Sequence, residues 1–270
     1  MCLILLAWHA HPEFPLVVAA NRDEYFSRPT EIAHFWPTHP SLLAGRDIQA
    51  GGTWMGITRE GRFAALTNFR EPESRDATPD VFSRGRLVSD FLGGTQPAEA
   101  YLGAIDSRAD DYRAFNLLCG TLADGLWHYS NRAGSGGATP RMQRLQPCVY
   151  GLSNNLLDIP WPKVARGKSA MTEALARLPR EDALFELLRD ETVHEDAKLP
   201  RTGISLEWER VLSAALVRAP HYGTRCSTIL MCDGNDVVTF DEQTFQPNAT
   251  PVAVTARNRF RFKLARNAAS

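Results

Sequence analysis

The sequence lacks the cysteine and histidine patterns that commonly bind metals or covalently attached haem. Its five cysteines are an odd number without any C-x-x-C pair, so neither a disulfide framework nor a zinc site is predicted. The seven histidines include no H-E-x-x-H or C-x-x-C-H motif, and no metal is expected. Free thiols suit a reducing cytosol, whereas non-covalent haem binding stays an open alternative.

Excess charge and a long apolar segment are also missing. The chain has 30 basic and 31 acidic residues and a formal net charge of -1, so nucleic-acid binding is not expected. Residues 3–8, the longest early apolar run, are far fewer than the roughly 20 of a membrane span. No basic segment precedes them as in a secretory signal. We therefore expect a cytoplasmic protein without a membrane span.

The length of 270 residues allows one large or two small domains, and one domain over residues 1–270 is the simpler prediction. Apolar runs around turn residues predict four β-hairpins and a final strand, at residues 3–20, 54–67, 115–129, 227–240 and 260–264. Helical spacing predicts two helix pairs, at residues 83–92 with 97–105 and 163–178 with 181–188. These elements fit an α+β fold, with antiparallel sheets between helical layers.

Cys2 would become the first residue if Met1 were removed, which is usual before a small side chain. A terminal cysteine carries a thiol and an α-amine, and the amine pKa of about 7.7–8.0 leaves part of it neutral at pH 7. Nucleophile and proton acceptor would then belong to one residue. The alternative is a small buried residue that begins a strand.

Asn21, Arg22, Asp23 and Glu24 follow the first predicted hairpin and should lie at its strand end. A short loop lets that end approach Cys2. Arg22 could then lower the thiol pKa or bind a substrate carboxylate, and Asp23 could hold the α-amine. The alternative is an ion pair on a solvated loop.

Seven short motifs occur in order from residue 1 to about 232: Met1-Cys2, Asn21-Arg22-Asp23-Glu24, Gly51-Gly52-Thr53-Trp54, Thr67-Asn68-Phe69-Arg70, Gly151-Leu152-Ser153-Asn154, Pro160-Trp161-Pro162-Lys163 and Gly223-Thr224-Arg225. Together they resemble the NRDE family, also called the transport and Golgi organisation 2 family. We interpret the chain as a member of that family.

This family is similar to the choloylglycine and penicillin acylase branch of the N-terminal-nucleophile hydrolases. The resemblance implies a four-layer αββα sandwich with Cys2 as nucleophile and Arg22 and Asp23 in the arginine and aspartate places. It also implies that Asn68 and Asn154 stabilise an oxyanion and that Arg225 orients the site. Turn formation by the asparagines and a surface position for the arginine are the alternatives.

Asn21, Glu24, Trp54 and Phe69 are predicted to contact a ligand, since the aromatic residues could line an apolar pocket. Packing in the core is the alternative for both aromatic residues. The resulting hypothesis is hydrolysis of a non-peptide carbon–nitrogen amide bond, without a cofactor, in a small molecule with a carboxylate or acyl group. The alternative is a non-enzymatic carrier or chaperone for haem or a lipid or acyl-CoA ligand, because relatives in the family are associated with such roles.

Overall fold

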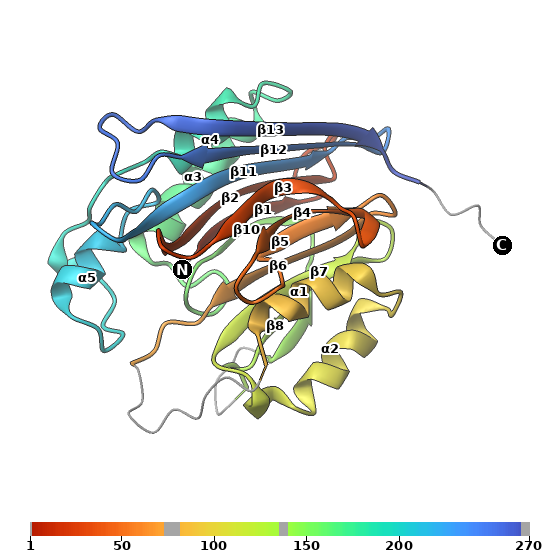
Figure 1. Cartoon of the computed structure of the whole chain (residues 1–270), viewed down its shortest axis with the longest axis horizontal. Helices are drawn as coiled ribbons and strands as arrows, with labels where there is room; N and C mark the ends of the chain where they lie inside the picture. Colours follow the sequence, from red (N-terminus) through yellow and green to blue (C-terminus); the bar gives the residue numbers. More distant parts are fainter. Residues whose placement is uncertain (1, 73–81, 135–139, 266–270) are drawn as a thin grey trace.

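Two antiparallel sheets packed face to face form the centre of the computed structural model, which describes residues 2–72, 82–134 and 140–265 (Figure 1). The six-stranded sheet has the order β10-β1-β2-β11-β12-β13. Its strands are β1 Cys2–Trp8, β2 Leu16–Tyr25, β10 Cys148–Leu152, β11 Tyr222–Cys232, β12 Val237–Phe245 and β13 Val254–Lys263. The seven-stranded sheet follows chain order, with β3 Thr30–Trp36, β4 His39–Asp47, β5 Met55–Thr58, β6 Arg62–Asn68, β7 Phe115–Thr121, β8 Gly125–Ser130 and β9 Met142–Arg144.

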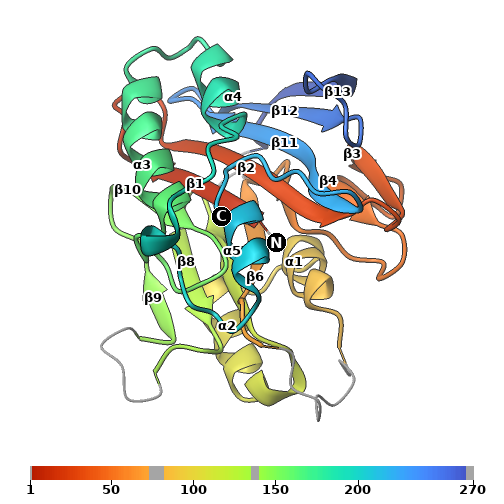
Figure 2. The same ribbon diagram turned by 90° about the vertical axis from the view of Figure 1, so that its left-hand side faces the viewer.

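Helices cover the outer face of each sheet (Figure 2). The six-stranded sheet packs against α3 (Pro162–Leu175) and α4 (Asp182–Leu188), and the seven-stranded sheet packs against α1 (Arg84–Gly93) and α2 (Ala98–Asp106). A short helix, α5 (Leu206–Val211), lies at the end of the sandwich where β1 begins. Within the described residues, no helix has the length and apolar character needed to cross a membrane.

The four layers follow from the two-residue period of the strands. In β1, Ile4 and Leu6 enter the core between the sheets, whereas Leu3 and Leu5 enter the core beneath α3 and α4. Strands with a core on both sides must be apolar at nearly every position, as β1 is. The predicted α+β class and αββα sandwich are confirmed.

The end of β2 differs from the prediction. Asn21, Arg22, Asp23 and Glu24 lie within β2 rather than after it, because β2 pairs with β11 as far as Tyr25. The ladder satisfies their backbone groups, so polar side chains do not end the strand. Strands β3, β4, β9 and β10 and helix α5 were not predicted, since they have no extended apolar period.

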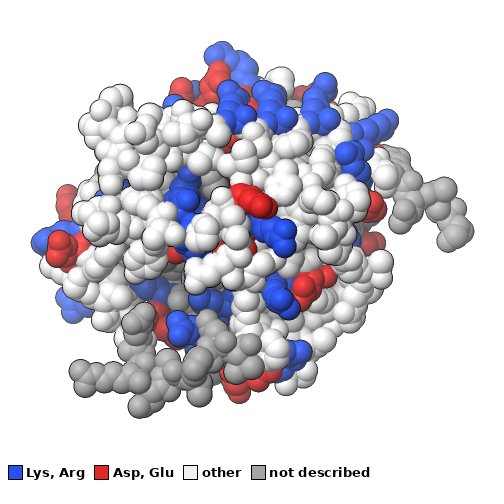
Figure 3. Space-filling view, in the orientation of Figure 1, with Lys and Arg blue, Asp and Glu red and all other residues white. Residues whose placement is uncertain are grey.

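The edge strand β13 carries a row of basic side chains on one face, and Figure 3 shows that row along the upper edge of the molecule. It comprises Arg257, Arg259, Arg261 and Lys263, all exposed. Arg257 forms an ion pair with the buried Asp241 at 2.7 Å. Charge along an edge strand opposes pairing with another sheet.

Gly52 provides a stability test of the packing between the loop before β5 and the start of α1. A Cβ at residue 52 would overlap the backbone of Gly85. We expect Gly52→Ala to lower the free energy of unfolding by about 1–3 kcal/mol, the usual cost of overpacking. The control is Gly103→Ala in α2, where a Cβ meets nothing within 4 Å; it should raise stability by up to about 1 kcal/mol. Urea denaturation measures both, and equal effects would contradict this packing.

Candidate active site

Cys2 lies at the start of β1, opposite Arg22 in the register with β2. Both side chains face the second sheet, because Ile4 and Ala20, two residues farther along the two strands, lie in the core between the sheets. A small cavity beside Cys2 is lined mainly by apolar side chains, among them Ile4, Ala20, Met55, Leu66 and Trp54. The thiol therefore borders an apolar space at the end of the sandwich.

Arg22 is held close to this thiol by contacts from the second sheet. Its guanidinium lies 4.4 Å from the ring centroid of Trp54 and donates a hydrogen bond to Thr30 Oγ1 at 3.3 Å. Burial raises the pKa of the Cys2 thiol, and the Asp23 carboxylate raises it further, whereas the Arg22 charge lowers it. Arg22 is thus the neighbouring side chain that favours the thiolate.

Asp23 points to the opposite face of β2, toward α3 and α4. Its Oδ1 accepts a hydrogen bond from Thr224 Oγ1 at 2.7 Å, and the residue is 1% exposed. Burial raises the pKa of the Asp23 carboxyl, which the Lys163 charge opposes. The register places Cys2 opposite Arg22, so the backbone nitrogen of Cys2 is on the side toward Asp23. The carboxylate is therefore suited to contact a Cys2 α-amine.

Asn154 contacts the end of β6, and the neighbouring Ser153 contacts the start of β1. Its Nδ2 donates to the Asn68 carbonyl at 2.8 Å. The Ser153 hydroxyl lies 3.0 Å from the Cys2 carbonyl oxygen and 3.2 Å from Asn154 Oδ1, so its proton can serve either acceptor. Asn154 is fully buried, and its amide nitrogen carries a second proton besides the one that it donates to Asn68. Asn68 is half-buried and contributes its carbonyl here.

Two predicted site residues make mainly structural contacts. The Asn21 amide donates to the Leu188 and Ala215 carbonyls, both at 2.8 Å, and thereby fastens β2 to the α4 layer. The Arg225 guanidinium donates to the Tyr25 carbonyl at 2.8 Å and to other carbonyls of the turn after β2. Both side chains thus stabilise the position of β2 and do not contact Cys2 in these hydrogen bonds.

Of the other three residues predicted to contact a ligand, Trp54 lines the cavity beside Cys2, whereas Glu24 and Phe69 do not. Glu24 accepts a hydrogen bond from the Tyr25 backbone at 2.9 Å and lies 3.8 Å from Arg22. Phe69 is half-buried next to the end of β6 and is not among the residues that line this cavity.

Four residues near Asp23 were not assigned a role from the sequence. Arg70 Nη1 donates to Glu209 Oε2 at 2.5 Å, with both residues buried, and the Tyr222 hydroxyl donates to the Asp23 carbonyl at 3.1 Å. Lys163 is 3% exposed. Arg70 and Lys163 could have been predicted as site residues, because each is the last residue of one of the seven motifs. Glu209 and Tyr222 lie outside the motifs and could not.

No metal-binding group emerges in the part of the chain that the structure describes. Among residues 2–72, 82–134 and 140–265, no three or more histidine, cysteine, aspartate or glutamate side chains cluster as metal ligands do. On the α3 side of β2, the buried charged groups include Asp23, Lys163, Arg70 and Glu209. They could orient an organic ligand or shift the protonation of its neighbours.

A solved structure described as a Caenorhabditis elegans N-acylethanolamine-hydrolyzing acid amidase ortholog shares this fold, with a TM-score of 0.50 and 10% identity over 85% of this chain and 92% of that chain. The likeness between the two chains is one of fold. The family model for Transport and Golgi organisation 2 matches residues 1–247.

Relatives over the full length agree with this family model. The Mus musculus Transport and Golgi organization 2 homolog is 36% identical over 264 residues, 90% of this chain and 92% of its own. The Bos taurus homolog is 35% identical over 285 residues, 97% of this chain and 100% of its own. The chain belongs to the Transport and Golgi organisation 2 family, as its motifs predicted.

The Arg70–Glu209 pair gives a test of the buried cluster. Glu209 accepts from Arg70 and also from the Thr202 backbone at 3.0 Å, so Glu209→Ala would leave a buried guanidinium unpaired. We expect a loss of about 3–5 kcal/mol in the free energy of unfolding. Glu195→Ala is the control, because its 3.2 Å pair with Lys198 is exposed and should contribute less than about 1 kcal/mol. Similar losses from both variants in urea denaturation would contradict the assigned burial.

Proposed function

We propose that this protein hydrolyses a non-peptide carbon–nitrogen amide bond with Cys2 as an N-terminal nucleophile. The observation that carries the proposal is the position of Cys2, which begins β1 opposite Arg22, with Arg22 lining the same small cavity and Asp23 next in β2. The N-terminal-nucleophile fold supports it, although the likeness to the solved amidase is one of fold alone. All five cysteines are free thiols, which suits the proposed cytosolic location.

The first step requires removal of Met1. The neutral α-amine of Cys2 then takes the thiol proton as Sγ attacks the carbonyl carbon of the amide. A new C–S bond forms and the carbonyl electrons move to oxygen. Asp23 holds the resulting α-ammonium, and Arg22 favours the thiolate by its charge.

The second group of interactions stabilises the negative oxygen. Asn154 supplies the Nδ2 proton that does not bond to the Asn68 carbonyl, and the half-buried Asn68 amide supplies a second donor. Such donors act strongly because they are fixed before charge develops. The C–N bond then breaks as the α-ammonium gives its proton to the leaving nitrogen.

Water completes the reaction. The free α-amine takes a proton from water as the oxygen attacks the thioester carbon, and the C–S bond breaks to release a carboxylic acid and restore the thiol. Apolar side chains of Ile4, Met55 and Leu66 border the thiol, which favours an apolar group next to the reacting carbonyl. The proposed substrate is therefore an amide of an apolar acid.

The first functional test concerns the terminus. Protein made in its native host should have an intact mass without Met1, and Cys2→Ala should abolish turnover of an acyl-amide panel because no thiol remains to attack. Cys148→Ala is the control, since that exposed thiol at the start of β10 should leave activity unchanged. Retained Met1 would exclude the mechanism. Binding of haem or long-chain acyl-CoA without turnover would instead support the carrier alternative.

The oxyanion role gives a second functional test. Asn154→Ala should lower kcat by about 10²–10³, the usual effect of losing one oxyanion donor. Asn155→Ala is the neighbouring control, because that side chain accepts a hydrogen bond from the Leu156 backbone and its loss should change kcat little. Thermal denaturation confirms that both variants are folded. An unchanged kcat in Asn154→Ala would remove this residue from the mechanism.

A further inference from the structure

Lys163 is a buried ammonium group whose hydrogen-bond donors are unused. It lies in the first turn of α3, is 3% exposed, and its Nζ has no hydrogen-bond partner among the described residues. An ammonium group carries three donors, and burying it without partners is costly. Such a group is therefore suited to a ligand that brings an acceptor.

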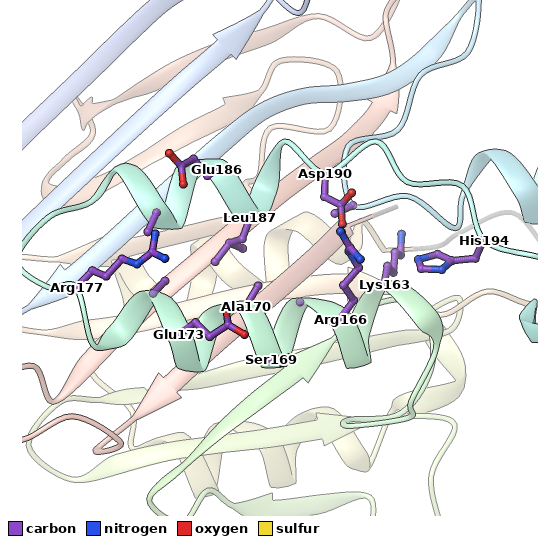
Figure 4. A pocket seen from close by; sticks show the side chains of 14 residues that line it. Lys163, Arg166, Ser169, Ala170, Glu173, Arg177, Glu186, Leu187, Asp190 and His194 are labelled. Atoms are coloured by element: carbon purple, nitrogen blue, oxygen red, sulfur yellow. The ribbon is translucent and has the colours of Figure 1, made fainter.

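A groove between α3 and α4, continued by the segment that follows α4, reaches this side chain (Figure 4). Figure 4 shows Lys163 between Arg166 and His194, with Asp190 on the opposite wall. Arg166 and Asp190 form an ion pair across the groove. Lys163 thus stands at the end of a cleft that also holds the Arg166–Asp190 pair.

The surroundings favour a single negative charge. Besides the groove residues, Lys163 interacts electrostatically with Asp23, Arg70, Cys2 and Glu209. Arg70 and Glu209 are paired with each other. The nearby Asp23 and Glu209 carboxylates would repel a doubly charged phosphate more than a carboxylate.

We propose that the Lys163 end of this groove binds the carboxylate of a small molecule, with Lys163 Nζ as the donor. The site lies on the helix side of the six-stranded sheet, whereas the Cys2 cavity lies between the sheets. Binding here does not require Cys2 to be a nucleophile, so it is measured separately from hydrolysis.

The binding should depend on pH with a defined sign. Burial lowers the pKa of Lys163 to about 8, and the Asp23 charge opposes that change. Only the ammonium form attracts a carboxylate. Affinity should therefore be highest below pH 8 and fall about tenfold per pH unit above it, as expected for one linked proton. Bound carboxylate should raise the Lys163 pKa by the same linkage.

The chain has four lysines, Lys163, Lys168, Lys198 and Lys263, so ¹³Cε-lysine labelling gives few NMR signals to assign. Butyrate titrated into the full-length wild-type protein at pH 7 should shift the Lys163 signal and leave the other three unchanged. No variant has to fold for this measurement. An unmoved Lys163 signal would overturn the proposal, as would an equal shift with neutral butyramide or tighter binding of inorganic phosphate.

Substitutions of two lysines test whether Lys163 itself binds the carboxylate. Lys163→Met should weaken butyrate binding about tenfold or more, the loss of one charge-assisted hydrogen bond. Lys163→Arg should retain part of the affinity. Lys168→Met on the same helix should bind butyrate like the wild type, since Lys168 pairs with Asp158 at 2.7 Å. Equal weakening by Lys163→Met and Lys168→Met would show general charge attraction and overturn the assigned site.

Discussion

The alternation of side chains along β2 is the constraint on which the candidate site depends. Since β2 continues to Tyr25 between β1 and β11, neighbouring residues must point to opposite faces. Arg22 consequently faces the thiol and the second sheet, whereas Asp23 faces α3 and Lys163. Two adjacent residues thus serve two different layers, and a slip of one residue in the register would exchange their environments.

Around this strand, the structure buries a group of charged side chains. Asp23, Lys163, Arg70 and Glu209 are all buried, and replacing buried ions by apolar groups is often neutral or stabilising. Local rules of stability are most often broken at functional sites. The burial of these four charges is therefore better explained by a role in ligand binding or proton transfer than by a contribution to stability.

Much of the fold follows from local pattern, and the rest depends on pairing. The hairpin of β5 and β6 was predicted within about one residue because both strands are apolar and Gly61 marks the turn. Strand β12 extends beyond its predicted end because buried Glu242 and Gln243 interrupt the apolar pattern but are satisfied by neighbouring strands and loops. The short loop between β1 and β2 was enough to predict that Cys2 and Arg22 lie close together. The proximity of Lys163 and Glu209 could not be predicted, because they lie on α3 and α5, which only the tertiary structure brings together.

Folding prepares the surroundings of Cys2 but does not by itself create the proposed proton acceptor. The register, the Arg22 charge and the Asn154 amide are set by the chain, whereas the α-amine of Cys2 exists only after a peptide bond is cut. With Met1 in place, Cys2 has no free α-amine to take the thiol proton, and the proposed mechanism has no other proton acceptor. Burial also raises the pKa of the Cys2 thiol, which disfavours the thiolate. The proposed mechanism therefore needs processing of the terminus, whereas the proposed carrier role does not.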